Sequence, residues 1–359
     1  MIVKGEKIAV DNVSRILLIQ LGDIGDVVLA TPTMRTLREN FVSSMIFVLV
    51  HEPASGIVEN CPWVDGTMSV EKKNRGLRDT IAYHKDFLTA LREGKFDLTI
   101  DLRAGTRGAI LSLLSGAGIR IGRYSENGTL WRNRLFTHLV RPNNELDQYS
   151  SLHSLNILAP LDIDIKDTTP ALEVPPEKEN SALELLRKAK VPLEKPIIAL
   201  HPFSRWGYKE WPIQNYIGLI DYIGSRYPVS LVLTGAPEEK DRAAEIVRGC
   251  NANVYNLAGR TSISELPGVL KRCRLLIGID SAAVHIAASV GTPTTTIFGP
   301  SSPTNWAPRG TQHQVISMDL PCVPCRRKGC DNSGVSRCLS ELGVQEVIAA
   351  VEKQIRAII

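Results

Sequence analysis

Short apolar runs alternate with amphipathic segments along the whole chain. Residues 16–21 form an apolar run of strand length, and a turn that contains Gly22 and Gly25 separates this run from an amphipathic segment that extends to about residue 38. Continuous apolar strands separated by helices are typical of a parallel sheet that is covered on both faces. The pattern therefore predicts an α/β protein.

The predicted elements fall into two sets, one in each half of the chain. In the first set we expect strands at 16–21, 45–50, 98–102 and 119–122, and helices up to residue 38, at 76–92 and at 106–114. In the second set, strands at 197–201, 230–234, 275–279 and 294–298 alternate with helices at 212–227, 238–248, 262–271 and 281–290. A final amphipathic helix is predicted at 344–359.

The alternation breaks at residues 162–176, which are rich in Asp, Thr and Pro, as is typical of a linker. A chain of 359 residues is also too long for one ordinary core. We therefore predict a first domain at 1–175, a second domain at 176–343, and a C-terminal helix at 344–359 that packs back on the first domain. Ligands of such open sheets bind beyond the carboxyl ends of the strands.

The composition narrows the class of protein. A net charge of +4 is too small to indicate a nucleic-acid-binding protein. No apolar run reaches the ~18–20 residues of a membrane span, and the first residues lack the apolar run of a signal peptide. We therefore expect a cytoplasmic protein.

The first candidate site is the turn after residues 16–21. Asp23 and Asp26 lie where free backbone amides and the positive end of a helix dipole face the edge of the sheet. Asp23 in this position is typical of a helix N-cap, and one of the two carboxylates is a candidate general base. The spacing Gly22-x-x-Gly25 differs from G-x-G-x-x-G, which disfavours a nicotinamide-dependent dehydrogenase.

Polar turns also follow strands in the second half. Ser204 and Lys209 precede a helix, where a hydroxyl and an ammonium group can bind phosphate, although a single lysine is more often a solvated surface residue. Glu238 and Glu239 follow residues 230–234. A carboxylate there either accepts hydrogen bonds from ribose hydroxyls or stabilises the first turn of a helix.

Residues 278–285 are the most informative segment of this half. Asp280 ends a predicted strand, and the small residues Ser281 and Ala282 begin a helix, where a phosphate can approach the backbone amides. His285 lies on the same helix face as Ser281. A single helical histidine is usually structural, but this one lies one turn from the predicted anion site.

These stretches together resemble the glycosyltransferase family 9 heptosyltransferases. The resemblance is carried, in the family order, by ILLIQLGDIGDVVLATPTMRTLRE, DLTIDLRAGTRGAILSLLSGAGIRIG, IALHPFSRWGYKEWP, VLTGAPEEKDRA and LAGRTSISELPGVLKRCRLLIGIDSAAVHIAASVGTPTTTIFGPSSPTNWAP. It implies the GT-B fold, in which two Rossmann-like domains with parallel sheets face each other across a cleft. It also implies an inverting enzyme that transfers heptose from ADP-heptose to the lipopolysaccharide inner core.

The resemblance also implies roles for single residues. Asp26 matches the general base proposed for the family, and Lys209 matches the lysine on the donor diphosphate. The other implied donor-binding residues are Glu239 or Glu238 near the ribose, and Asp280, Ser281 and His285 in the donor turn. Three positions depart from the family pattern: Asp23 stands where serine is common, and Phe203 and Ala282 each replace a usual glycine. The methyl group of Ala282 would alter the geometry or the choice of donor.

The implied mechanism needs no metal ion or other cofactor. Asp26 removes a proton from the acceptor, while Lys209, Ser204 and the amides that begin at Ser281 stabilise the departing ADP. Because inner-core lipopolysaccharide carries carboxylates and phosphates, a basic acceptor site is expected. The candidate acceptor-binding residues are Arg107, Arg120 and Asp23. Peripheral contact with the inner face of the inner membrane is compatible with such an acceptor.

Four of the seven cysteines cluster near the C-terminus, at Cys322, Cys325, Cys330 and Cys338. Four thiols among turn residues can hold a structural zinc ion, although the spacing is not that of a standard zinc ribbon. Reduced thiols and a labile disulfide are the alternatives.

Other functions stay open on the sequence alone. A related enzyme with another sugar donor, or with another acceptor such as a protein hydroxyl, has the same pattern. A non-catalytic nucleotide-sugar binder is disfavoured because Asp26, Lys209 and Asp280 are all present. The exact heptose, the acceptor and the oligomeric state are not encoded in recognisable motifs.

Overall fold

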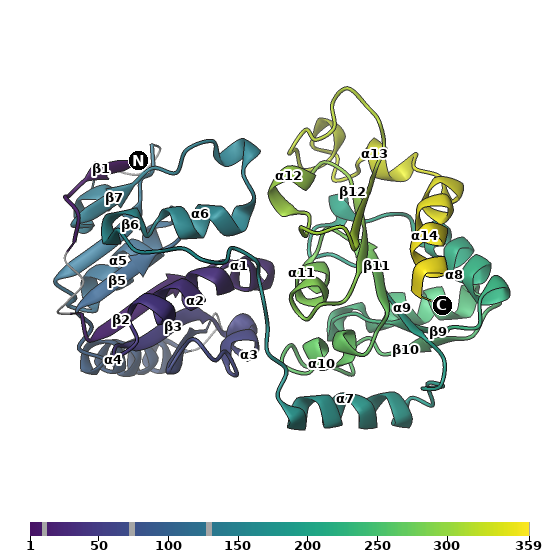
Figure 1. Ribbon diagram of the computed structural model, residues 1–359, viewed down its shortest axis with the longest axis horizontal. Helices are drawn as coiled ribbons and strands as arrows, with labels where there is room; N and C mark the ends of the chain where they lie inside the picture. The colour runs from purple at the N-terminus through teal and green to yellow at the C-terminus, as the bar shows by residue number, and fades with distance from the viewer. Residues whose placement is uncertain (9–12, 72–75, 127–130, 359) are drawn as a thin grey trace. The chain divides into compact units, whose positions relative to one another are not determined.

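The computed structural model describes residues 1–8, 13–71, 76–126 and 131–358. The chain divides into two compact units, Met1–Pro170 and Ala171–Ile359. Each unit is a sheet of mostly parallel strands with helices packed on its faces (Figure 1). The predicted α/β class is confirmed.

The sheet of the first unit has seven strands in the order β1-β7-β6-β5-β2-β3-β4. All neighbouring strands are parallel except β1 and β7, which are antiparallel. The strands are β1 (Ile2–Lys4), β2 (Arg15–Gln20), β3 (Met45–His51), β4 (Gly66–Val70), β5 (Leu98–Asp101), β6 (Ile119–Arg123) and β7 (His138–Val140). The central strands β2 and β5 are almost wholly buried, which explains why their sequences read as continuous apolar runs.

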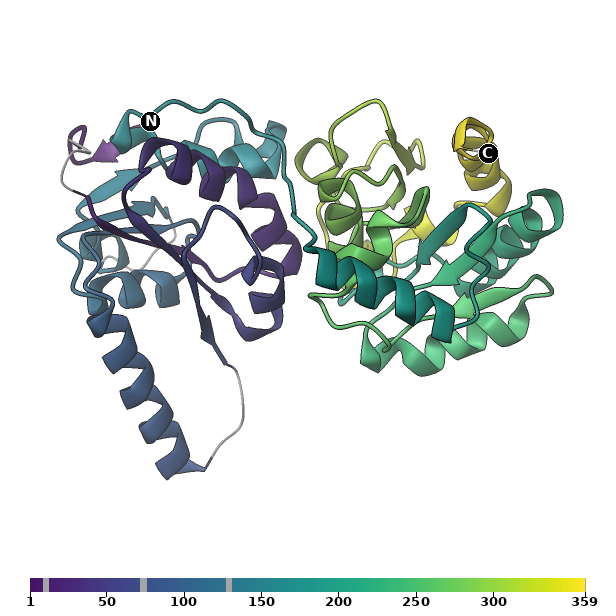
Figure 2. The same ribbon diagram turned by 60° about the horizontal axis from the view of Figure 1, so that its bottom comes forward.

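Six α-helices accompany this sheet among the residues described. They are α1 (Ile24–Leu29), α2 (Thr31–Asn40), α3 (Ser55–Val58), α4 (Leu77–Glu93), α5 (Thr106–Leu114) and α6 (Ser150–Asn156), with short 3₁₀ turns at η1 (Glu52–Ala54), η2 (Arg132–Leu135), η3 (Glu145–Asp147) and η4 (Ala159–Leu161). The helix expected up to residue 38 is divided at Ala30, because Pro32 lies in the first turn of α2 and lacks a backbone N–H. Figure 2 shows α4 extending beyond the end of the sheet.

The sheet of the second unit has six parallel strands in the order β10-β9-β8-β11-β12-β13. The strands are β8 (Ile197–His201), β9 (Ser230–Leu233), β10 (Val254–Asn256), β11 (Leu275–Ile279), β12 (Thr294–Phe298) and β13 (His313–Ser317). The helices are α7 (Pro176–Lys188), α8 (Ile213–Arg226), α9 (Lys240–Gly249), α10 (Leu266–Lys271), α11 (Ala282–Ser289), α12 (Pro303–Trp306), α13 (Arg337–Ser340) and α14 (Val344–Ile358), with turns at η5 (Gly207–Lys209), η6 (Pro237–Glu239) and η7 (Cys330–Asn332). Because β8 and β11 are neighbours, the loops after them emerge at the same sheet edge.

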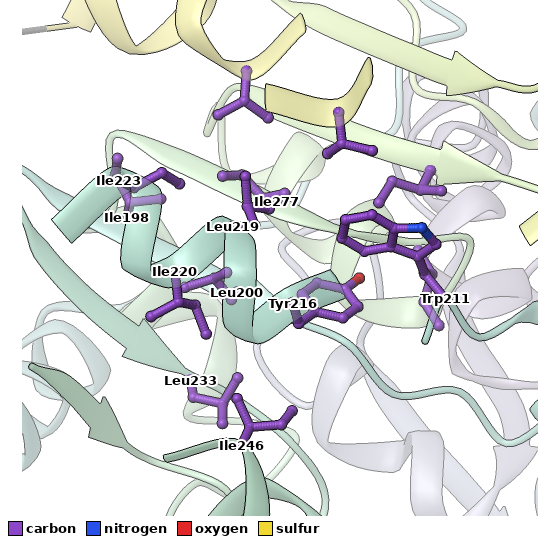
Figure 3. Close-up of a cluster of buried hydrophobic side chains, with 14 of the residues drawn as sticks. Ile198, Leu200, Trp211, Tyr216, Leu219, Ile220, Ile223, Leu233, Ile246 and Ile277 are labelled. Atoms are coloured by element: carbon purple, nitrogen blue, oxygen red, sulfur yellow. The ribbon is translucent and has the colours of Figure 1, made fainter. Parts of the chain in front are cut away.

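The core of this unit contains a large cluster of apolar side chains, part of which is drawn in Figure 3. Trp211 is buried in it, and its indole Nε1–H donates to the carbonyl of Leu342 at 2.9 Å. Trp211 therefore has a structural role, because it anchors the segment before α8.

The C-terminal helix packs on the second unit. Val347, Val351 and Ile355 of α14 are buried in the core of the second unit, and Glu352 accepts hydrogen bonds from Tyr222 and Tyr227. The apolar face of this helix completes the core of the second unit, and packing of the helix against the first domain stays a prediction. Among the residues described, no helix is both long and apolar enough to cross a membrane.

Candidate functional site

The turn between β2 and α1 holds Asp26 in the first helical turn. Asp23 is the N-cap of α1, and the two residues form a capping box in which the Asp23 amide donates to Oδ2 of Asp26 at 2.9 Å. A Cβ atom at Gly22 would lie 2.4 Å from that same oxygen. Gly22 is therefore required for the Asp26 side chain to fold back over the turn.

Arg103 supplies a second partner for Asp26. Its guanidinium NH1 donates to Oδ2 at 2.8 Å, and the Asp26 side chain is 18% exposed. Within the described part of the chain, Oδ1 of Asp26 accepts no hydrogen bond from another residue. One oxygen of this carboxylate is thus held in place, and the other is available to accept a proton.

Behind this turn lies a buried ion pair that the sequence analysis did not single out. Asp101 ends β5, and its Oδ2 lies 3.6 Å from NH2 of Arg132. Burial raises the pKa of Asp101 to about 7 and lowers the pKa of Arg132. Two polar residues at the end of a buried strand, Asp101 and Arg103, were the available signal, since strand ends of this type carry ligand-binding residues.

The predicted acceptor-binding arginines separate in the structure. Arg107 lies in the first turn of α5 and is half-buried. Arg120 lies near the amino end of β6, and its guanidinium donates to the carbonyls of Ala117 and Leu135. Nε and NH1 of Arg120 thus make structural contacts within the unit, and the acceptor-binding role of Arg120 stays a prediction.

In the second unit, Lys209 and Asp280 form an ion pair. Lys209 Nζ lies 2.6 Å from Oδ2 of Asp280, and the two side chains are 21% and 5% exposed. One residue follows β8 and the other follows β11, so the parallel pairing of these strands brings them together. The ammonium group has three protons, so Lys209 can donate to an anion while it remains paired with Asp280.

The loop that carries Ser204 and Lys209 is held by Glu210. Its Oε1 accepts from the Ser204 amide at 3.0 Å, and its carboxylate is paired with both terminal nitrogens of Arg242. The Ser204 hydroxyl accepts from the Trp206 amide at 3.2 Å and retains its own proton for donation. Glu210 and Arg242 are the supporting residues that the sequence analysis missed.

The turn after β11 has the form predicted for an anion site. Ser281 is the N-cap of α11 and Ala282 is the first helical residue, so the first amides of the helix point out of its N-terminus. The Ser281 hydroxyl oxygen is buried and has no hydrogen-bond partner among the described residues. His285 is buried one turn later, and its ring centroid lies 6.4 Å from that of Trp306.

Glu238 and Glu239 differ in environment. Oε2 of Glu239 accepts from the Ala236 amide at 2.7 Å and caps its own turn, and burial raises the pKa of Glu239. Glu238 is exposed. The capping interpretation therefore holds for Glu239, and the ribose-binding role stays a prediction for both residues.

His201, at the end of β8, is a further polar group beside this site. Its Nδ1 lies 3.0 Å from the Thr234 hydroxyl, and that hydroxyl donates to the Leu200 carbonyl at 3.1 Å. Burial lowers the pKa of His201 to about 4. The ring is therefore neutral near pH 7, and its Nδ1–H donates to Thr234.

The four C-terminal cysteines are free thiols. Cys338 is buried, and burial, followed by the influence of Cys325, Cys330 and Cys322, raises its pKa to about 11. Among the described residues, no three Cys, His, Asp or Glu side chains are gathered closely enough to hold a metal ion. The arrangement therefore does not support the predicted structural zinc site.

Comparisons with known proteins identify the family of the chain. Residues 85–336 match the description glycosyltransferase family 9 (heptosyltransferase). Lipopolysaccharide heptosyltransferase 3 of Escherichia coli is 30% identical over 339 residues, which cover 92% of this chain and 96% of that relative.

Solved structures share the fold along nearly the whole chain. A family 9 glycosyltransferase from Veillonella parvula DSM 2008 has a TM-score of 0.83 at 23% identity, covering 98% of this chain and 99% of that one. An E. coli heptosyltransferase solved with ADP-2-deoxy-2-fluoro heptose has a TM-score of 0.71 at 19% identity, covering 94% and 99%. The likeness establishes the GT-B fold. Because residues 85–336 match the family and a lipopolysaccharide heptosyltransferase is 30% identical over 92% of this chain, the chain belongs to glycosyltransferase family 9, the heptosyltransferases.

Proposed function

We propose that this protein is an inverting glycosyltransferase that moves a heptose from ADP-heptose to the lipopolysaccharide inner core. The observation that carries the proposal is the Lys209–Asp280 pair beside the N-terminus of α11, in a chain of the heptosyltransferase family. A cation next to free helix amides is a site for a diphosphate. The related enzyme solved with an ADP-heptose analogue supports ADP-heptose as the donor.

In the donor site, Lys209, Ser204 and Ser281 bind the diphosphate together with the first amides of α11. Asp280 holds Lys209 at the end of its side chain, at 2.6 Å. His285 and Ala282 line the same helix start, and Glu238 or Glu239 binds the ribose. As the glycosidic bond of ADP-heptose breaks, the leaving ADP gains negative charge. Hydrogen-bond donors that are already in position stabilise this developing charge more than they stabilise the bound substrate.

In the acceptor site, Asp26 removes the proton from the attacking hydroxyl. Its Oδ2 is held by Arg103 and by the Asp23 amide, which leaves Oδ1 to take the proton. Arg107 binds anionic groups of the acceptor. Asp23 lies in the turn that carries Asp26 and also contacts the acceptor. The sugar passes through an oxocarbenium-like state and is attacked opposite the leaving group, so its anomeric configuration inverts. This scheme uses no metal ion, and we propose that the enzyme needs no cofactor for catalysis.

The acceptor also bears on where the enzyme works. Lipopolysaccharide core is assembled on a lipid, and we propose that the protein acts in the cytoplasm with peripheral contact at the inner face of the inner membrane. Positive charge that binds anionic acceptor groups would also favour contact with an anionic lipid surface.

The experiment that tests the function is product analysis by mass spectrometry. Purified protein is incubated with ADP-heptose and a series of core acceptors truncated at successive sugars. We expect one acceptor to gain the mass of one heptose, with ADP released in equal amount. Matched reactions with ADP-glucose and UDP-glucose serve as controls. Transfer only from another donor, or only to a protein hydroxyl, would overturn the proposed substrates while retaining the family chemistry.

The cysteine cluster carries a separate proposal. We propose that zinc, when present, draws the four cysteine thiolates together into a structural site in the second unit. The proposal is supported by four free thiols that lie close together in the sequence. Elemental analysis tests it: we expect about one zinc per chain in protein purified without chelators, and loss of that zinc in Cys325→Ser. Metal-free wild-type protein under reducing conditions would exclude the site.

A further inference from the structure

Two buried charges, Asp101 at the end of β5 and Arg132 in η2, are not used by the proposed mechanism. The side chains of Asp101 and Arg132 are 0% and 1% exposed, and both lie in the first unit. Removing two charges from water costs free energy that their mutual attraction often fails to offset. Well-packed apolar residues of similar volume are often as stabilising as a buried ion pair, so a gain in stability is not a sufficient reason for charges at this place.

The surrounding chain leaves room for the carboxylate of Asp101. Gly108 of α5 faces it, and a Cβ atom there would lie 2.5 Å from each carboxylate oxygen of Asp101. Oδ1 of Asp101 accepts from the Arg103 amide at 3.1 Å, and Oδ2 has no hydrogen-bond partner in the described part of the chain. The carboxylate is therefore held by one backbone amide and by the charge of Arg132.

Arg132 binds the carbonyl side of Arg103, the residue whose amide donates to Asp101. Its NH2 donates to the carbonyl of Arg103 at 2.9 Å, and its Nε donates to the carbonyl of Gly105 at 3.3 Å. NH1 donates to the carbonyl of Arg123 at 2.7 Å, which ties the loop to the end of β6. The amide and the carbonyl of Arg103 are thus both fixed by the buried pair.

The side chain of Arg103 reaches from this fixed backbone to the candidate general base. It is 46% exposed, so solvent alone would leave its long side chain many rotamers. Its NH1 nevertheless lies 2.8 Å from Oδ2 of Asp26, on the oxygen that also accepts from the Asp23 amide. Fixing the backbone of Arg103 restricts the directions from which its guanidinium can approach Asp26.

We propose that Asp101 and Arg132 are positioning residues, which hold the backbone of Arg103 so that its guanidinium orients the carboxylate of Asp26 for proton removal. This inference rests on the general-base role proposed for Asp26. The alternative is that the pair only stabilises the first unit. The two differ in how the effects of substitutions combine.

The test is a double-mutant cycle between Asp101→Asn and Arg103→Ala, with kcat for heptose transfer as the readout. Asp101→Asn keeps the side-chain volume and removes the charge that pairs with Arg132. We expect each single substitution to lower kcat by about 10- to 100-fold, the loss typical of a slightly misplaced catalytic group. The double variant should be no slower than the slower single variant, because both changes disable the same contact. Arg103→Lys, which keeps a cation near Asp26, should recover part of the loss.

Controls separate positioning from folding. Arg132→Lys keeps the partner charge of Asp101 but cannot reach the three carbonyls, so it repeats the kcat test if Asp101→Asn does not fold. Arg134→Ala removes an exposed arginine from the same turn, η2, and should leave kcat unchanged. Binding of ADP should be unchanged in all variants, since the proposed donor residues lie in the second unit.

Two outcomes contradict the inference. If the kcat losses of Asp101→Asn and Arg103→Ala multiply, or if Asp101→Asn lowers the melting temperature but leaves kcat at the wild-type value, the pair is only structural. Neither outcome affects the proposed function, provided that Asp26→Asn is inactive. An active Asp26→Asn would instead overturn the general-base role itself, whatever the cycle shows.

Discussion

Asp26→Asn is expected to lose heptose transfer, with kcat lowered by at least about 10²–10⁴-fold. Asparagine has the size of aspartate and can still accept hydrogen bonds from the Asp23 amide and from Arg103, so the turn should keep its form. It cannot take a proton from the acceptor hydroxyl. The measurement is kcat with ADP-heptose and the preferred acceptor, together with the Kd for ADP, which should equal that of the wild type.

The matched control is Asp23→Asn. Asparagine is as good an N-cap as aspartate, so α1 should begin at the same place. We expect this variant to retain most of the wild-type kcat. If Asp23→Asn is inactive and Asp26→Asn is active, then Asp23 is the general base, and the proposed role of Asp26 is wrong.

Lys209→Met should have the second largest effect. It removes the cation proposed to face the diphosphate, and a single electrostatic donor of this type contributes about 10²–10³-fold to kcat. We therefore expect kcat/KM for ADP-heptose to fall by about that factor, with weaker binding of ADP. Steady-state kinetics and calorimetric titration with ADP measure the two effects.

Part of that loss has another cause, because Lys209→Met leaves the buried Asp280 without its partner. This unpaired charge should lower the melting temperature of Lys209→Met. The double variant Lys209→Met with Asp280→Asn removes the charge, so its melting temperature should return toward the wild-type value while kcat/KM stays low. Lys209→Arg keeps the positive charge and should retain more activity than Lys209→Met. Unchanged ADP binding by Lys209→Met would remove this residue from the donor site.

The central strands and the site turns could be predicted from sequence because their signals are local. Buried strands such as β2 and β11 are continuous apolar runs. Asp280 follows β11 directly, and Asp26 lies in the first helical turn after β2. Parallel pairing then places such turns at one sheet edge, which is how Lys209 and Asp280 meet. By contrast, β1, β7 and β10 have only three residues each, too few for a periodic pattern.

The features that could not be predicted from the sequence depend on contacts between residues that are distant along the chain. Nothing local to Arg132 indicates that it pairs with Asp101, or that its donors fix the backbone of Arg103. The same holds for Arg120, whose guanidinium donates to the carbonyls of Ala117 and Leu135. The amphipathic pattern of α14 predicted a buried face, yet not which core that face would complete.

The anomeric configuration of the product tests the central claim most directly. The donor implied by the family resemblance is ADP-L-glycero-β-D-manno-heptose, which is β-linked. The one-bond C1–H1 coupling of the transferred heptose, measured by NMR, distinguishes the two anomers. A single displacement, with Asp26 as base and the diphosphate leaving from the opposite face, predicts an α-linked heptose on the acceptor. A β-linked product, or free heptose without transfer, would contradict it.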